Sequence, residues 1–114
     1  NKNNIDSSDF VFSGSSVMGA LGLRAPKDFD AFHSPSYILP EGISSHNTSL
    51  YINVKINELI YNPKKHFYYM GFKFLDPFIL LNFKINRYNI KKSAKDERDI
   101  LILKEFLNKS SNKN

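Results

Sequence analysis

The fold is decided by the stretch FSGSSVMGALGLRAPKDFDAFH, which covers residues 12–33. This stretch turns at Gly14-Ser15, continues through a short apolar segment and ends on two acids, Asp28 and Asp30. Because side chains alternate along a strand, a strand over residues 28–33 places both carboxylates on one face. Two such groups can hold Mg²⁺ together with water and substrate phosphates, and a turn at a helix start offers N–H groups to a phosphate. The stretch therefore suggests phosphoryl or nucleotidyl transfer.

The residues around this stretch set the order of the first elements. Residues 10–12 form a short apolar run that predicts a buried strand, which enters a tight turn at Ser13-Gly14. Either Ser15 or Ser16 is placed to cap a short helix that ends near Gly22. Pro26 then prevents further helix before the acidic strand.

The length and composition predict a modest folded domain. The 114 residues are 41% hydrophobic and 14% aromatic, which excludes a wholly disordered chain. We expect one α+β domain over residues 9–108, with flexible tails at 1–8 and 109–114 and a small mixed sheet whose helices pack mainly on one face. The absence of cysteine excludes disulfides and cysteine-based zinc sites. No apolar run approaches the roughly 18 residues that span a bilayer, and no signal segment opens the chain, so a cytoplasmic protein is expected.

The charge is distributed unevenly. Residues 1–57 carry four Lys or Arg and five Asp or Glu, whereas residues 58–114 carry twelve and six, within a total of +5. A basic half beside a carboxylate-bearing half suits an anionic substrate, although a lysine-rich half is also common as solvated surface. Recognised nucleic-acid modules and Arg-rich runs are missing, so nucleic acid is an unlikely partner.

The second half of the chain alternates strand and helix signals. We expect a loop over residues 34–48, a half-buried strand over 50–60, and a hairpin of 66–69 and 72–75 around Met70-Gly71. Asp76-Pro77 marks a helix start, and the apolar stripe of that helix is Phe78, Leu81, Ile85 and Tyr88. A last helix opens at residues 93–96 and turns Ile100, Leu103 and Leu107 inward.

Several further residue groups have two possible interpretations. The Lys84, Arg87 and Lys91 face of the first long helix either follows phosphates or is solvated, and Asp96 and Asp99 are expected to pair with lysine and arginine of their own helix. The hairpin aromatics could stack bases but are favoured as core. The histidines at 33, 46 and 66 match no zinc spacing, and His33 is expected to be structural or exposed.

The residues Gly14-Ser15, Arg24 and Lys27-Asp28-Phe29-Asp30 resemble the nucleotidyltransferase superfamily, which includes polymerase β and kanamycin nucleotidyltransferase. In that family a strand leads into Gly-Ser or Gly-Gly, a short helix follows, and the next strand carries D-x-D. The later segments at 60–63, 66–69, 71–74, 84–87 and 95–100 also resemble small bacterial domains found near surface-polysaccharide enzymes. Together the similarity covers residues 10–107.

The resemblance implies a nucleotidyltransferase (polymerase β-like) fold and the transfer of a nucleoside monophosphate from a triphosphate to a small acceptor, such as a sugar or sugar phosphate. The implied catalytic and metal-binding residues are Asp28 and Asp30, with Mg²⁺ or Mn²⁺ as the ion. Phosphate contacts are implied for Gly14, Ser15, Ser16, Arg24 and Lys27, with further substrate contacts at Lys73, Lys84 and Arg87. A larger enzyme or a fused domain is a further expected partner.

One expected group is missing from the motif. Active members of the family add a third carboxylate from a following strand, but here residues 50–56 of the expected strand offer Asn53 and Lys55 instead, and Glu58 lies just past them. A catalytically degenerate binding module of the same fold therefore remains an alternative, and a toxin–antitoxin nucleotidyltransferase is a third. The sequence leaves the nucleotide and the acceptor open.

Overall fold

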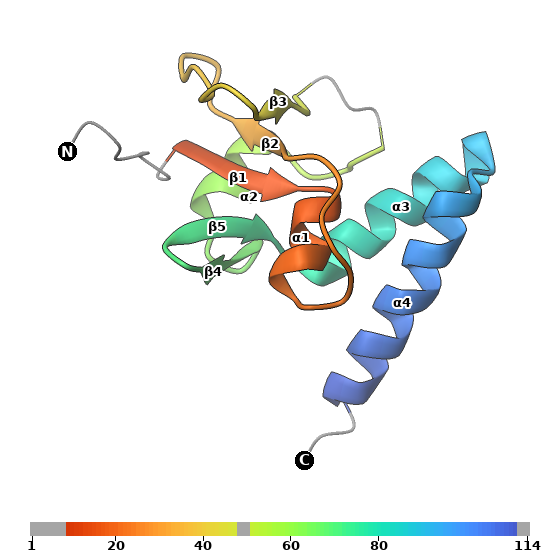
Figure 1. Ribbon diagram of the computed structural model, residues 1–114. Coiled ribbons are helices and arrows are strands. Elements are labelled where there is room, and N and C mark those ends of the chain that lie inside the picture. The colour runs from red at the N-terminus through yellow and green to blue at the C-terminus, as the bar shows by residue number, and fades with distance from the viewer. Residues whose placement is uncertain (1–8, 48–50, 112–114) are drawn as a thin grey trace. The chain divides into compact units, whose positions relative to one another are not determined.

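The structure, a computed structural model, describes residues 9–47 and 51–111 (Figure 1). The chain divides into two compact units, residues 1–49 with 54–76 and residues 50–53 with 77–114. The first unit is a five-stranded mixed sheet with two short helices, and the second is a pair of longer helices. These elements confirm the α+β class and the mixed sheet. The single domain expected over residues 9–108 stays a prediction.

The sheet is built around β1 (Phe10–Ser13), which lies between β2 (Asp30–His33) and β5 (Phe72–Leu75). β1 pairs antiparallel with β2 and parallel with β5. β3 (Ser44–Ser45) pairs parallel with β2, and β4 (His66–Tyr69) pairs antiparallel with β5. The strand order is therefore β3-β2-β1-β5-β4.

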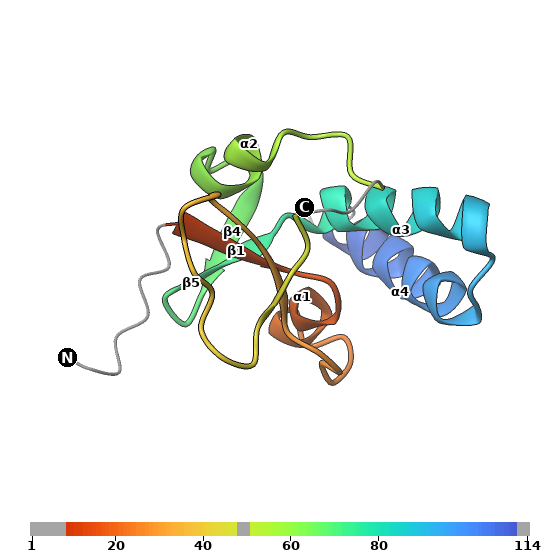
Figure 2. The same cartoon turned by 90° about the horizontal axis from the view of Figure 1, so that it is seen from above.

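Two short helices cover the central strand. Figure 2 shows α1 (Ser15–Ala20) and α2 (Ile56–Tyr61) on opposite sides of β1. All four residues of β1 are buried, as expected of a strand that is covered on both faces. The helices of this unit do not share one face of the sheet. The expected packing of the helices mainly on one face stays a prediction, because it also concerned the helices of the second unit.

Aromatic rings fill one part of the core of the first unit. The ring of Phe12 lies 5.1 Å from that of Phe74 and 5.8 Å from that of Phe72, measured between centroids. Phe67 of β4 stacks on Phe74 at 5.7 Å. Of the hairpin aromatics that were favoured as core, Phe74 is buried and Phe67 and Phe72 pack in its cluster. Core is wrong for Tyr68 and Tyr69, which are exposed.

Two local predictions, the hairpin turn and the start of the first long helix, are confirmed. Met70 and Gly71 have φ angles of 52° and 82°, and the positive φ at both central residues is what a type I′ hairpin turn requires. The long helix α3 (Pro77–Lys91) begins directly after Asp76, with proline at its first position. Both features depend on a few adjacent residues, so the sequence alone sufficed to predict them.

The prediction of a strand over residues 50–60 is wrong. Residues 48–50 lie outside the described residues, 51–55 have no regular structure, and 56–61 form α2. Ile56, Leu59 and Ile60 follow helical spacing, and the last two are fully buried. Residues 51–55, in which apolar and polar side chains alternate, pair with no strand of the sheet.

Two further boundaries differ from expectation within the first unit. β2 begins at Asp30 rather than at residue 28. Residues 44–45, inside the expected loop, form β3, which pairs with Asp30 and Ala31. Both changes bring the segment after β3 next to the start of β2.

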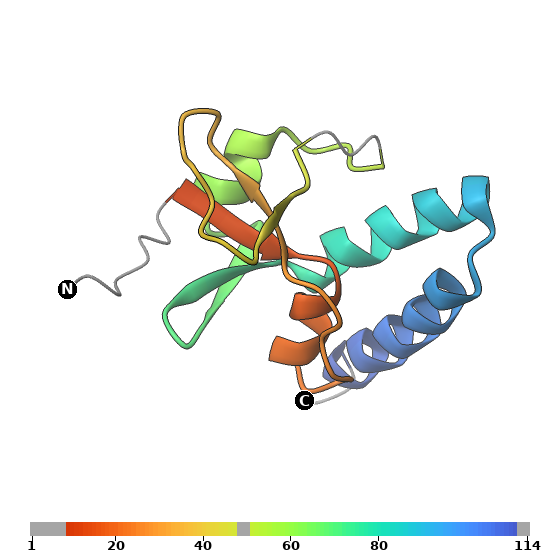
Figure 3. The same cartoon turned by 45° about the horizontal axis from the view of Figure 1, so that its top comes forward.

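The second unit consists of α3 and α4 (Ala94–Ser111), which lie side by side in Figure 3. Lys92 ends α3 in a left-handed conformation, with φ of 53°, and its N–H donates to the carbonyl of Tyr88. Ile100, Leu103 and Leu107 are buried as expected. Because α4 continues through Ser111, residues 109–111 are helical rather than part of a tail. The remaining tail residues lie outside the described ranges.

The inward face of α3 is rotated from the expected stripe. The buried residues are Leu80, Phe83 and Lys84, whereas Phe78 is exposed. The rotation follows from Lys84, which the sequence pattern assigns to the polar face but which lies inside the helix pair, bound to Asp99.

Candidate functional site

The pairing of β1 with β2 brings the Gly14 turn and Asp30 together. Ser13 is the register partner of Asp30, so the turn that follows Ser13 passes directly by the Asp30 carboxylate. Gly14 has φ of 68° and ψ of −142°, a region that residues with a side chain rarely adopt. A Cβ at this position would lie 3.4 Å from Asp30 Oδ2 and 3.7 Å from His46 Cε1. Glycine therefore keeps the space in front of both side chains open.

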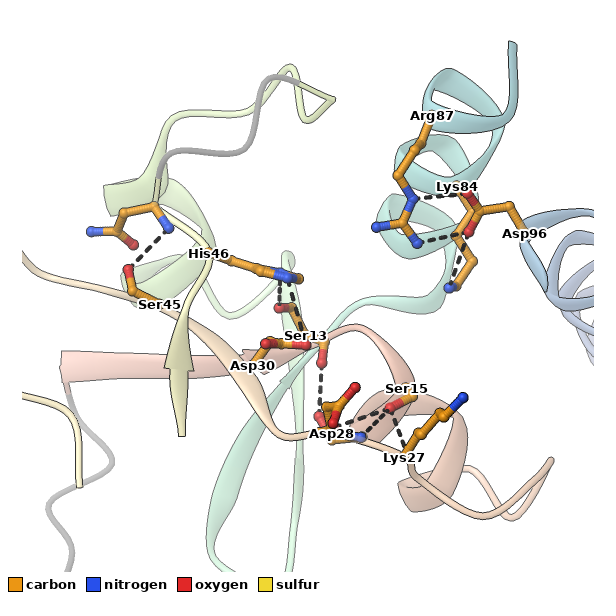
Figure 4. A network of polar contacts seen from close by, with 12 residues as sticks. Ser13, Ser15, Lys27, Asp28, Asp30, Ser45, His46, Lys84, Arg87 and Asp96 are labelled. Atoms are coloured by element: carbon orange, nitrogen blue, oxygen red, sulfur yellow. Dashed lines mark hydrogen bonds and ion pairs between the residues drawn. The ribbon is translucent and has the colours of Figure 1, made fainter. Parts of the chain in front are cut away.

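His46 is the residue of this site that the sequence did not single out. Its N–H donates to the carbonyl of Ala31 at 2.8 Å, which continues the pairing of β3 with β2. The imidazole Nδ1 lies 2.7 Å from Ser13 Oγ, and Nε2 lies 3.6 Å from Asp30 Oδ2. Figure 4 shows the carboxylate of Asp30 and the ring of His46 pointing toward one another. Only the pairing of β3 with β2 places His46 here, so no local sequence signal could have found it.

Ser13, His46 and Asp30 do not form a nucleophilic triad. Ser13 is only 1% exposed, so its hydroxyl is closed off from a substrate. The side chains of His46 and Asp30 are 21% and 23% exposed, which leaves the edge formed by these two groups open to solvent. Ser13 is a partner that orients His46.

Ser15 has a structural role that differs from the expected cap. Its hydroxyl donates to the carbonyl of Asp28 and accepts from the N–H groups of Lys27 and Asp28, at 3.0–3.1 Å. No side-chain cap is formed on α1, whose N-cap residue is Gly14. Ser16 donates instead to the carbonyl of Ser13 at 2.8 Å. Both serines are buried, and their hydroxyls hold the backbone that surrounds the turn.

The other residues of the front motif lie next to this turn. Asp28 and Lys27 are exposed, in the segment that Ser15 ties to the start of α1 (Figure 4). Because β2 begins at Asp30, the strict alternation expected for Asp28 and Asp30 does not extend to Asp28. Arg24 donates from Nη1 to the carbonyl of Ala25 at 3.1 Å. The structure therefore brings residues 14, 15, 27, 28 and 30 into one region.

The three basic residues expected to be further substrate contacts make internal interactions. Lys73 is buried and donates to the carbonyl of Ile60 at 2.8 Å. Lys84 and Arg87 belong to the second unit, where Lys84 Nζ lies 2.9 Å from Asp99 Oδ2 and Arg87 binds Asp96 through two hydrogen bonds. The prediction that this basic face is solvated is therefore wrong at Lys84. The prediction that Asp96 and Asp99 pair within α4 is also wrong, because both bind side chains of α3.

The electrostatics of the second unit follow from this burial. Removal from water lowers the pKa of Lys84 from its ordinary value, against the opposing effect of Asp99. The hydrogen bonds from Arg87 to Asp96 raise the pKa of Arg87. In the first unit, the hydrogen bond from the Tyr61 hydroxyl to Asp9 raises the pKa of that tyrosine.

The donors around the turn suit a divalent cation that retains water. Asp28 and Asp30 offer oxygen ligands, and the absence of a Cβ at Gly14 leaves room beside Asp30. Within residues 9–47 and 51–111, no group of three or more His, Cys, Asp or Glu side chains is arranged around a common point. An ion at Asp30 would therefore take several of its ligands from water and substrate, as Mg²⁺ commonly does.

Comparison with protein-family models, with curated proteins and with solved structures found no match to this chain. None of the helices in the described part of the chain has the length and apolar character needed to cross a membrane.

Proposed function

We propose that this chain is a divalent-cation-dependent nucleotidyltransferase that transfers a nucleoside monophosphate from a nucleoside triphosphate to a small acceptor. The observation that supports the proposal most directly is the position of the Asp30 carboxylate opposite the side-chain-free face of Gly14. A polymerase β-like fold agrees with the antiparallel pairing of β1 and β2 and the helix between them. The acceptor class, a sugar or sugar phosphate, rests on the sequence resemblance.

In this proposal each front-motif residue has a defined task. Asp28 and Asp30 would hold the divalent cation, which when bound would neutralise charge on the transferred phosphoryl group. The backbone at Gly14 approaches the phosphates, because no Cβ intervenes. Ser15 and Ser16 act through the backbone that their hydroxyls hold in place. Arg24 and Lys27 supply positive charge to the remaining phosphates.

The enzyme is tested by measuring pyrophosphate release with each of the four common nucleoside triphosphates, Mg²⁺ and a panel of sugar and sugar-phosphate acceptors. The wild type is expected to release pyrophosphate, and Asp28→Asn and Asp30→Asn are each expected to abolish release. Glu41→Gln is the matched control, because Glu41 is an exposed carboxylate in the loop before β3. Release that persists in both aspartate variants would contradict the proposal.

A non-catalytic binding module is the second candidate. It is favoured because, among the described residues, no third carboxylate is grouped with Asp28 and Asp30, and an imidazole, that of His46, lies beside Asp30. The two candidate functions are distinguished by comparing thermal stabilisation by nucleotide with pyrophosphate release. A module of this kind raises its thermal unfolding temperature with nucleotide but gives no pyrophosphate with any acceptor. Growth arrest on expression would instead support a toxin of the same fold.

A further inference from the structure

We infer that Asp30 and His46 together hold the divalent ion of this site, and that the ion is a first-row transition metal rather than Mg²⁺. The inference rests on the proposed function in one respect, namely that Asp30 is a metal ligand. It adds a ligand, His46, and a preference among cations. The side chains concerned are contributed by β2 and by the residue directly after β3.

The separation of the two groups is the first argument. Asp30 Oδ2 and His46 Nε2 are 3.6 Å apart, which is longer than a hydrogen bond. Two ligands that each lie about 2.1 Å from one ion are roughly 3.0 Å apart when adjacent in an octahedron, and about 3.6 Å apart when the angle at the ion widens toward 120°. The observed spacing therefore accommodates one ion with small side-chain adjustments.

The second argument is the contact behind the imidazole. Histidine ligands usually donate their other ring N–H to a fixed acceptor, which sets the tautomer and the ring orientation. Ser13 Oγ, 2.7 Å from Nδ1, is placed for this role, and Ser13 is held in turn because Ser16 donates to its carbonyl. With the proton on Nδ1, the lone pair of Nε2 is directed to the side where Asp30 lies (Figure 4).

The third argument is access. Both side chains are about one-fifth exposed, and the backbone of Gly14, which lies against both of them, carries no Cβ. An ion at this position keeps coordination sites for water or phosphate oxygens. The neighbouring turn would bring such oxygens to it in the proposed reaction.

The donor set decides the kind of ion. Carboxylate oxygens suit Mg²⁺, Ca²⁺ and Mn²⁺ alike, whereas imidazole nitrogen favours first-row transition metals. A mixed site of one carboxylate and one imidazole therefore selects against Mg²⁺. In this proposal His46 also takes the role of the third ligand, for which the family resemblance implies a carboxylate.

The experiment uses the full chain with Mn²⁺ as the probe and Mg²⁺ as the competitor. Continuous-wave electron paramagnetic resonance measures the affinity for Mn²⁺, and pulsed measurements detect the ¹⁴N coupling of a bound imidazole. We expect Mn²⁺ to bind at least about tenfold more tightly than Mg²⁺, and His46→Gln to remove both the ¹⁴N coupling and that preference.

Two further variants make the result decisive. His33→Gln is the matched control, because His33 hydrogen bonds to Ser34 and Ser45 and should leave the coupling and the affinity unchanged. If His46→Gln does not fold, Ser13→Ala replaces it. Its Mn²⁺ affinity is expected to fall about tenfold, because the imidazole of His46 loses the hydroxyl that orients it. Equal affinities for the two ions, absence of ¹⁴N coupling in the wild type, or a coupling that persists in His46→Gln would each overturn the inference.

Failure of the inference and failure of the proposed function are distinguishable. Pyrophosphate release supported equally by Mg²⁺ and Mn²⁺, without ¹⁴N coupling, leaves the transferase standing and removes His46 as a ligand. A ¹⁴N coupling that depends on His46, in a chain that releases no pyrophosphate, supports the metal site and removes the transferase. Wherever the wild type binds Mn²⁺ at this site, Asp30→Asn is expected to lose that binding, whether or not the chain releases pyrophosphate.

Discussion

Lys84 Nζ lies 2.9 Å from Asp99 Oδ2, and both side chains are 2% exposed. Asp96 lies 3.8 Å from the same ammonium group and accepts two hydrogen bonds from Arg87. A buried charge of this kind is tolerated only while its partner is present, because a charge left alone in the interior retains its full desolvation cost. The pair therefore ties α3 to α4 within the second unit.

The first prediction concerns removal of this pair. Lys84→Met is expected to lower the free energy of unfolding by about 3–5 kcal/mol, since Asp99 is left buried without its cation. The double variant Lys84→Met/Asp99→Leu should recover most of that loss, because neither charge then remains. Urea unfolding followed by circular dichroism measures both. Lys109→Ala is the control, since the Lys109–Glu105 pair is solvent-exposed and contributes less than about 1 kcal/mol.

The second prediction is the alkaline pH dependence of stability. Burial places the pKa of Lys84 in the folded chain below 10.5, its ordinary value, so between these two values the unfolded chain binds more protons. The free energy of unfolding should therefore rise as pH increases through this window and decline as pH falls through the folded pKa. Lys84→Arg should lack the rise, because guanidinium stays protonated throughout.

Tyr61 has the opposite effect on the pH dependence of stability, so its hydroxyl is removed by mutation before Lys84 is tested. Its pKa in the folded chain is raised above 10.0, so it withdraws stability as pH increases through that range. Both chains are therefore compared in a Tyr61→Phe background, by urea midpoints across the alkaline range. Identical slopes for the lysine and arginine chains would contradict the assignment to Lys84.

The third prediction separates the two roles of Gly14. Gly14→Ala should cost about 1–3 kcal/mol because of its positive φ, and should also weaken Mn²⁺ binding, since the new methyl group would lie 3.4 Å from Asp30 Oδ2. Gly22→Ala also places a side chain at a positive φ, 73°, but has no atom within 4 Å of the added Cβ. It should lose stability and keep its metal affinity. Equal affinities in the two variants would show that the Gly14 face is not part of the site.

The fourth prediction concerns the anchor of Asp28. Ser15→Ala removes three hydrogen bonds to residues 27 and 28, so the amides of Lys27 and Asp28 should exchange at least about tenfold faster. The expected loss of stability is about 1–3 kcal/mol, because three part-buried hydrogen bonds, each worth about 0.5–1.5 kcal/mol, are removed. Ser16→Ala, whose hydroxyl binds the carbonyl of Ser13, should leave these two amides protected. Hydrogen exchange followed by NMR measures the rates.

Features set by adjacent residues could be predicted from the sequence. The strand over residues 10–13, the turn at Gly14, the short α1, the Met70-Gly71 hairpin and the start of α3 all depend on local turn and cap chemistry. The sequence also directed attention to the region of Asp30. Each of these signals lies within a few residues of the feature that it predicts.

Features set by distant partners could not be predicted in this way. β3 has two residues and no pattern of its own, so its pairing with β2, and with it the position of His46, appears only in the folded chain. The orientation of α3 was missed because a pattern rule assigns lysine to solvent, whereas Asp99 of α4 allows Lys84 to lie inside. The segment 56–61 was missed because its helical spacing follows an alternating run.

The pairing of β1, β2 and β3 in sequence order also bears on how the chain folds. Ser13, Asp30 and His46 come from one continuous stretch, whereas the pairing of Phe12 with Phe74 joins positions far apart in the chain. Closing short loops loses less chain entropy than closing long ones, so the early part of the sheet is favoured to assemble first during folding. The proposed ion-binding residues would then come together before β5 is added to the sheet.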